Sequence, residues 1–325
     1  MSITWMDGFD LYNSTYNGAA KGYSSFPGGS SYATGRLGVG QCLSASNAGT
    51  KWPVSAGSAI TNLSFGFAFQ VSSLGNTLVT FWNGGSVIDS LRINSSGQLQ
   101  AYRGDAATLL GSSASGLVAV DTWNYLEVEF TRDASAGVFK AYLNGVQVLN
   151  LTGQNTGASD IDSLQVYWPQ TYKMDDLYTT NTATKLGECR IDTLRPSADT
   201  ATKDWTPSTG TANYAMVDET TFDASDYVTG ASVGNKDYYD CANLSFTPAS
   251  VFAVQVTTLA KKDDANTRTF RGNIKSSSTE GNGATRGLGT SYSIYSDIFE
   301  TDPNGSIAWT ATSVNAAQVG IEVVS

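Results

Sequence analysis

Two glutamates, Glu127 and Glu129, stand two positions apart in the segment 123–130. Alternate residues of a β-strand share one face, so the two carboxylates are expected on the same side. Some β-sandwich glycosidases carry three acidic residues at this spacing, with one as the nucleophile and one as the acid. Here Thr131 occupies the third position and breaks the pattern. We therefore predict a solvated strand face and no catalytic residues.

A second acidic pair, Asp175 and Asp176, comes directly before Leu177 and Tyr178. Adjacent residues of a strand point to opposite sides, so the two carboxylates are expected to diverge. Carboxylate oxygens are suitable ligands for calcium, but a calcium site needs more oxygens than these two residues supply. Structural hydrogen bonding is the favoured interpretation and a calcium site is the alternative. No other cofactor is expected.

Four aromatic side chains are candidates for contact with sugar rings: Trp82, Tyr102, Trp168 and Tyr172. An aromatic face that remains exposed gives a sugar ring an apolar surface against which to pack. Aromatic residues of β-sandwiches are more often part of the core or of an interface. Both interpretations are kept for these four residues.

The chain has 325 residues and no histidine. This excludes Ser-His-Asp and Cys-His mechanisms, histidine general bases and histidine-ligated metal sites. The net charge of −10, from 19 basic and 29 acidic residues, is unfavourable for binding nucleic acid. The longest basic run, Lys261-Lys262, is followed at once by two aspartates. We expect no nucleic-acid partner.

Three widely separated cysteines, Cys42, Cys189 and Cys241, form no metal-ligand spacing. They are expected to be free thiols of a chain that folds in a reducing cytosol. The sequence shows no signal peptide and no stretch near the ~20 apolar residues of a membrane span. We expect a soluble protein with no membrane partner.

Short strands separated by turn residues dominate the pattern. Residues 63–71 place large apolar side chains at every second position, which predicts a strand with one buried face. Asn144-Gly145 lies between two alternating runs and predicts a tight hairpin. The polar segment 179–186 marks a boundary between domains of residues 1–182 and 187–325. The fold class predicted is all-β, with a jelly-roll β-sandwich followed by a smaller β domain.

The second domain is expected to carry one short helix at 313–318, with Thr312 or Ser313 as its N-cap, and a last strand at 321–324. Its other strand candidates are the ranges 188–194, 213–217, 226–233, 250–260, 267–276 and 291–299.

Four segments of the first domain carry a resemblance: LSFGFAFQV (63–71), WNYLEVEF (123–130), FKAYLNGVQVLN (139–150) and KMDDLYTTN (173–181). Through them, residues 1–182 resemble the concanavalin A-like/laminin-G-like jelly rolls. This resemblance implies a fold and is nearly silent on function.

Three further segments carry a second resemblance: MDGFDLYN (6–13), LGECRIDTLRPSADTATKDWTPSTGTANYAMVDE (186–219) and FETDPNGSIAWTATSVNAAQVGIEVV (299–324). Through them, the whole chain resembles structural proteins of tailed bacteriophages. The resemblance implies a virion component, folded in the host cytoplasm and displayed at the particle surface. Its expected partners are phage capsid or tail proteins and copies of itself, most simply as a trimer.

The main hypothesis is therefore a non-enzymatic virion structural protein: a head decoration, a fibre or a tail-associated module. Its second domain would supply docking and assembly. The alternative is a glycan-binding adhesin that recognises a host surface polysaccharide. A carboxylate-based glycosidase or lyase is a third hypothesis, which the broken acidic pattern disfavours.

Overall fold

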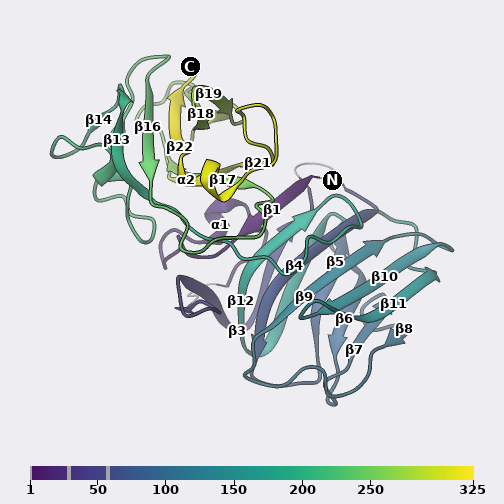
Figure 1. Cartoon of the computed structure of the whole chain (residues 1–325). Helices are drawn as coiled ribbons and strands as arrows, with labels where there is room; N and C mark the ends of the chain where they lie inside the picture. The colour runs from purple at the N-terminus through teal and green to yellow at the C-terminus, as the bar shows by residue number, and fades with distance from the viewer. Residues whose placement is uncertain (1, 28–30, 56–58) are drawn as a thin grey trace. The chain divides into compact units, whose positions relative to one another are not determined.

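The computed structural model describes residues 2–27, 31–55 and 59–325. The chain forms two compact units, one of residues 1–10 and 22–191, the other of residues 11–21 and 192–325 (Figure 1). The segment 11–21, which the sequence analysis assigned to the first domain, thus groups with the second. The all-β fold class is confirmed, because strands make up almost all of the regular structure.

All strands of the first unit pair antiparallel. They are β1 (Ile3–Asp7), β2 (Ser31–Thr34), β3 (Gln41–Pro53), β4 (Asn62–Val71), β5 (Asn76–Asn83), β6 (Ser86–Ile93), β7 (Leu99–Arg103), β8 (Thr108–Ser112), β9 (Asn124–Thr131), β10 (Gly137–Leu143), β11 (Val146–Gln154) and β12 (Ser163–Thr180).

The long strand β12 belongs to both layers of a sandwich. Its first part, residues 163–166, pairs with β5, and its last part, residues 172–180, pairs with β4. One leaf therefore has the order β11-β10-β9-β4-β12, and the other has the order β12-β5-β6-β7-β8. We call them the β4 leaf and the β5 leaf. They correspond to the sandwich that the sequence predicts.

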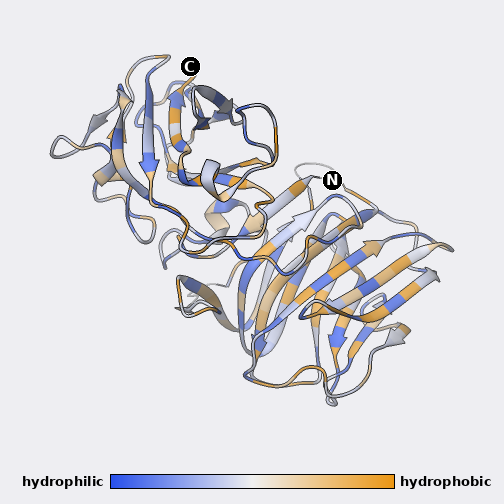
Figure 2. Cartoon of the chain, in the orientation of Figure 1, coloured by the Kyte–Doolittle hydropathy of each residue, from blue (hydrophilic) through white to orange (hydrophobic). Residues whose placement is uncertain are grey.

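Aromatic side chains fill the space between the leaves. Phe81 of the β5 leaf packs against Phe130 of the β4 leaf, with ring centroids 4.5 Å apart. Along β4, Leu63, Phe65 and Phe67 are fully buried, as the period of two predicts. Figure 2 shows the resulting alternation of hydrophobic and hydrophilic residues along the strands of this unit.

The turn at Asn144-Gly145 joins β10 to β11, as predicted. Asn144 has φ 50° and Gly145 has φ 79°, the left-handed conformation that this pair of residues adopts readily. The residue types of the turn therefore set the register of the hairpin.

The second unit holds a mixed set of short elements. They are α1 (Gly18–Lys21), β13 (Pro196–Lys203), β14 (Thr206–Pro207), the 3₁₀ helix η1 (Tyr214–Met216), β15 (Val228–Thr229), β16 (Lys236–Cys241), β17 (Val254–Ala260), β18 (Thr269–Ser276), β19 (Thr279–Asn282), β20 (Arg286–Gly287), β21 (Ser293–Phe299), α2 (Ala311–Asn315) and β22 (Gln318–Val323). Its main sheet has the order β13-β16-β22-β18-β19, and β14–β15 and β17–β21 form separate pairs.

The core of the second unit gathers around Trp309 and Ile274, with Val256 and Val314 beside them. The indole N–H of Trp309 donates to the carbonyl of Phe299 at 2.9 Å, which satisfies its polar group in this buried position.

Several details of this unit differ from the sequence predictions. Helix α2 begins earlier than expected, because Thr310 is the N-cap and forms a reciprocal capping box with Ser313. Residues 213–217 form the turn around η1 because the buried Asn213 side chain donates to the carboxylate of Asp237. No strand occupies residues 188–194, whose last three residues belong to the second unit.

Candidate functional site

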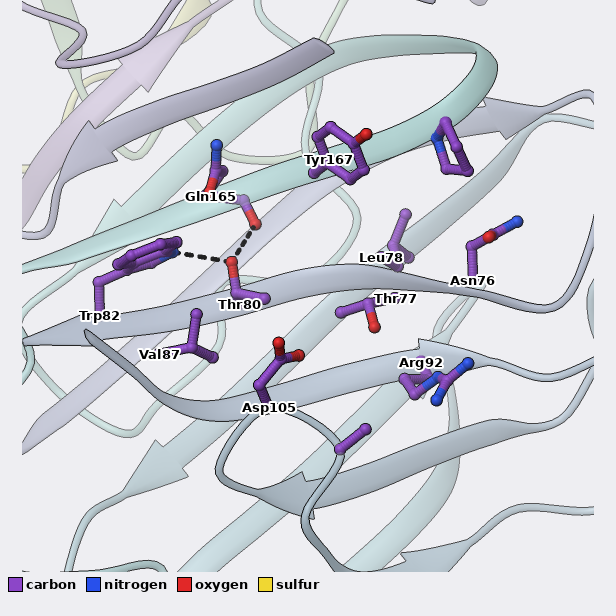
Figure 3. Close-up of a pocket in the computed structure, with 12 residues that line it drawn as sticks. Asn76, Thr77, Leu78, Thr80, Trp82, Val87, Arg92, Asp105, Gln165 and Tyr167 are labelled. Carbon is purple, nitrogen blue, oxygen red and sulfur yellow. Dashed lines mark hydrogen bonds between the residues drawn. The ribbon is translucent and has the colours of Figure 1, made fainter. Parts of the chain in front are cut away.

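A groove lies on the outer face of the β5 leaf (Figure 3). Along β5, Val79 and Phe81 point into the core and are fully buried, so the alternate residues Thr80 and Trp82 face outward. The groove has a volume of about 560 Å³, within the range typical of small-ligand sites. It is lined by Asn76, Thr77, Leu78, Thr80, Trp82, Val87, Arg92, Asp105, Ala106, Gln165, Tyr167 and Pro169.

Two aromatic side chains stand at the groove. Tyr167 of β12 is 40% exposed, and its hydroxyl donates to Oδ1 of Asn47 at 2.8 Å, which fixes the ring. Trp82 is half-buried, and its indole N–H donates to Oγ1 of Thr80 at 2.8 Å. The ammonium of Lys51 lies 3.8 Å from the centre of the Trp82 ring and covers one of its faces. Tyr167 is therefore the more accessible apolar surface of the two.

Several polar groups of the groove are not used by the protein itself. Among the described residues, no side-chain hydrogen bond is formed by the amide of Gln165 or by the carboxylate of Asp105. Thr77 likewise uses its hydroxyl for no contact within the described chain. Groups of this kind normally bind water or a ligand. An aromatic surface beside free donors and acceptors can bind a molecule that has both apolar faces and hydroxyl groups.

The wall that carries Asp105 is a turn held by Ser90 of β6. The Ser90 hydroxyl donates to the carbonyl of Gly104 at 3.0 Å and accepts from the N–H of Ala106 at 3.2 Å. Ala106 has φ 54°, a left-handed conformation that needs such support in a residue with a side chain. Ser90 therefore presents Asp105 at the groove (Figure 3).

The four predicted sugar contacts divide between the groove and other positions. Trp82 lines the groove. Tyr102 lies one strand beyond β6, where its hydroxyl donates to Oε1 of Gln100 at 3.2 Å. Trp168 and Tyr172 are buried, with 0% and 1% exposure, so neither offers a ring face to a ligand. These two belong to the core, the alternative that the sequence analysis kept.

Asp175 and Asp176 both contact Arg36, so the expected divergence of their side chains is not seen. A bulge in the pairing of β12 with β4 and a left-handed φ of 52° at Asp176 turn the chain at this point. Asp175 accepts from the backbone N–H of Arg36 at 2.9 Å, and Asp176 pairs with its guanidinium at 2.5 Å. The backbone N–H of Ile191 donates to the other oxygen of Asp176 at 2.7 Å.

Each oxygen of this acidic pair thus accepts from the protein, since the remaining Asp175 oxygen accepts from the N–H of Asp176. Burial, and next the charge of Asp176, raises the pKa of Asp175 to about 8. Burial raises the pKa of Asp176 as well, against the opposing effect of Arg36. The described chain has no cluster of three or more metal-ligating side chains. The arrangement matches structural hydrogen bonding, and a calcium site stays an untested alternative.

Glu127 does not lie on a solvated strand face, contrary to prediction. Its side chain is 1% exposed, and its Oε1 accepts from the Tyr178 hydroxyl and from the Gly187 N–H, both at 2.7 Å. Its Oε2 lies 3.3 Å from the ammonium of Lys185. Glu129 is half-buried and accepts from the Tyr142 hydroxyl at 3.1 Å. Glu127 is buried because the segment 184–191 folds back over the outer face of the β4 leaf.

The three cysteines are free thiols, with Cys42 buried and Cys189 and Cys241 half-buried. In the part of the chain that the structure describes, no helix is long and apolar enough to span a membrane.

The sequence analysis missed Tyr167, Gln165, Arg92 and Asp105. A pattern in the sequence could have identified Tyr167 and Gln165. Leu164, Val166 and Trp168 are large apolar residues at alternate positions of β12, so the residues between them face outward. For Arg92 and Asp105 there was no such signal, because a strand and a distant turn meet only in the folded sheet.

No family model and no curated protein matches the sequence. Among solved structures, domain 4 of AbnA, a GH43 extracellular arabinanase from Geobacillus stearothermophilus in complex with arabinotriose, is similar with 16% identity and a TM-score of 0.39. The match covers 57% of this chain and 94% of that domain.

The carbohydrate binding module CBM66 from Bacillus subtilis is similar with 12% identity and a TM-score of 0.34, over 49% of this chain and 95% of the module. A Bacillus subtilis protein with a galectin-like fold is similar with 9% identity and a TM-score of 0.37, over 56% of this chain and 96% of that protein. These distant likenesses carry no function, which must be argued from the groove itself.

Proposed function

We propose that the first unit is a glycan-binding module and that the groove on the β5 leaf is its site. The observation that carries this proposal is the exposed Tyr167 ring beside the uncommitted amide of Gln165 and carboxylate of Asp105. A sugar ring has an apolar C–H face and a rim of hydroxyls. It therefore needs an aromatic surface and free hydrogen-bonding groups at the same place.

Each lining residue has a distinct role in this proposal. Tyr167 packs against the C–H face of one sugar unit, and the Asn47 contact holds its ring in place. Gln165 both donates to and accepts from hydroxyls, and Asp105 accepts from them. Trp82 forms the end wall of the site, since Lys51 occupies one of its faces.

The module acts by binding and not by catalysis. Glycoside hydrolysis by the usual mechanism needs two carboxyl groups that flank the scissile bond. Asp105 is the one acidic residue among the described residues that line the groove. Glu127 and Glu129 lie on β9 of the other leaf, and the oxygens of Glu127 are engaged by Tyr178, Gly187 and Lys185.

An oligosaccharide array followed by calorimetric titration of the best ligand tests the proposal. Tyr167→Ala should weaken binding about tenfold, the effect of losing one aromatic contact of ~1.5 kcal/mol. Tyr227→Ala is the matched control, since Tyr227 is 48% exposed and lies in the second unit. Binding to no oligosaccharide, or equal affinities for wild type and Tyr167→Ala, would refute the groove as a glycan site.

The biological location of this glycan-binding module remains a prediction that rests on the resemblance to bacteriophage proteins. A virion component and a glycan-binding module are compatible roles, with the host surface polysaccharide as the ligand and phage proteins as the partners. Electron microscopy of the particle tests the location at its surface. Light scattering of the purified chain tests the expected trimer, which a monomer would contradict.

A further inference from the structure

Within the described part of this acidic chain, Arg92 has no anionic partner, unlike most of the arginines. Ion pairs within the described residues join carboxylates to Arg36, Arg132, Arg268, Arg271 and Arg286. The only hydrogen bond from the Arg92 guanidinium within the described chain is a long one of 3.4 Å, from Nη2 to the carbonyl of Gly75. A chain with a net charge of −10 offers many carboxylates, so an unpaired arginine calls for an explanation.

The position of Arg92 makes the missing partner costly. Its Nε atom is buried and has no hydrogen-bond partner among the described residues. A buried N–H of a charged group that lacks a hydrogen-bond partner is unfavourable, and an anion bound by the half-buried guanidinium would offset part of this cost. Because Arg92 lines the groove, the place open to such an anion is the ligand site itself (Figure 3).

Three charged side chains of described residues lie at or beside the groove. Lys51 adds a second positive charge beside Trp82, the aromatic end wall of the groove. Among the described residues that line the groove, Asp105 is the one carboxylate, and it forms no ion pair with Arg92. The described lining itself thus carries one charge of each sign, and Lys51 adds a positive charge beside Trp82.

We propose that the groove selects an acidic glycan, in which the carboxylate of a uronic acid residue pairs with Arg92. This inference rests on the glycan-binding function proposed above and names its ligand class. A guanidinium presents two parallel N–H groups that match the two oxygens of a carboxylate. The neighbouring sugar hydroxyls are then available to Gln165 and Asp105.

The test compares two ligands that differ only in this group. The probes are trigalacturonic acid and the same trisaccharide with its carboxyl groups reduced to primary alcohols. Calorimetric titration of the full chain should give a dissociation constant about tenfold to hundredfold lower for the acidic form, as expected for charge-assisted hydrogen bonds. Acetate at an equal carboxylate concentration should not displace the acidic trisaccharide, because it lacks the sugar rings.

Substitutions locate the effect at Arg92. Arg92→Gln should reduce the affinity for the acidic trisaccharide to that for the reduced one, while Arg92→Lys retains part of the difference. Arg268→Gln is the matched control, because this exposed arginine lies in the second unit. The melting temperature of each variant reports whether it folds, and the comparison of ligands on the wild-type chain needs no variant.

The possible failures are distinguishable. If neither trisaccharide nor any other oligosaccharide binds, the proposed function itself is wrong. If the reduced form binds as well as the acidic one, or Arg92→Gln leaves the preference unchanged, the carboxylate proposal is wrong and glycan binding stands. Displacement by acetate would also overturn it, since a simple carboxylate would then suffice.

Discussion

Replacing Glu127 with glutamine should loosen the segment that covers the β4 leaf. Glu127 receives three donors from this region of the fold: the Tyr178 hydroxyl, the Gly187 N–H and the Lys185 ammonium. Burial and the charge of Glu127 raise the pKa of Tyr178 well above its usual range, so this hydroxyl remains a donor. A glutamine keeps one acceptor oxygen but loses the negative charge.

The expected loss of stability in Glu127→Gln follows from these contacts. A hydrogen bond to a charged group contributes about 1 kcal/mol more than a neutral one, and two such bonds end on Oε1 of Glu127. The contact with the quarter-exposed Lys185 adds at most about 1 kcal/mol. Together, Glu127→Gln should reduce the local stability by about 2–3 kcal/mol.

Glu129→Gln is the matched control on the same strand. Glu129 is more exposed, and its contacts are longer: 3.1 Å to the Tyr142 hydroxyl, 3.3 Å to the backbone N–H of Lys185 and 3.4 Å to the Lys140 ammonium. Its replacement should change the local stability by less than about 1 kcal/mol. The difference between the two variants therefore measures the burial of Glu127.

Hydrogen exchange followed by mass spectrometry on the full chain gives the local free energy. In Glu127→Gln, amides of residues 184–191 should exchange about 30-fold faster or more, and in Glu129→Gln less than about fivefold faster. Glycan binding should persist in both variants, since β9 lies in the leaf opposite the groove. Equal and small effects of the two substitutions would refute this argument and would instead support the solvated strand face predicted from the sequence.

Three further predictions concern the groove and the second unit. Gly49→Ala would place a Cβ against Nε2 of Gln165, a flexible side-chain end, so affinity for glycan should fall about threefold to tenfold with the melting temperature unchanged. Ser90→Ala removes both hydrogen bonds between the Ser90 hydroxyl and the turn 104–107. The amides of this turn should therefore exchange faster and glycan affinity should fall, and unchanged values would contradict the role of Ser90. Burial, and next Asp226, raises the pKa of Glu219 from 4.5 to about 7. Between these two pH values the folded state keeps the Glu219 proton, which the unfolded chain releases. Stability should therefore fall between pH 4.5 and 7, and calorimetric melting of Glu219→Gln should show a weaker dependence.

Local pattern was enough to predict most of the first unit. The alternation along β4 and the Asn144-Gly145 turn encode a buried face and a hairpin in a few adjacent residues. In the second unit, the strands β17, β18 and β21 lie within predicted ranges, whereas β13 and β16 do not. The sequence of β13, PSADTATK, has no large apolar residue and hence no period of two to detect.

The choice between Tyr167 and Trp168 shows where sequence reasoning about the site failed. Both are aromatic and adjacent, and the sequence analysis named Trp168 but not Tyr167 as a candidate sugar contact. Trp168 continues the alternation of the buried residues Leu164 and Val166, so it is expected in the core and Tyr167 on the outer face of the sheet. The structure has this arrangement. Position along the strand, and not residue type, decides which ring can meet a ligand.

The two outer faces of the sandwich have different environments, and this difference explains why the groove is on the β5 leaf. On the β4 leaf, the segment 184–191 of the same chain engages the polar groups, as when Gly187 and Lys185 bind Glu127. On the β5 leaf, Gln165 and Arg92 keep donors that no described residue binds. Unsatisfied polar groups beside an exposed ring are unfavourable unless water or a ligand completes them. The face that the chain leaves incomplete is therefore the one with a reason to bind.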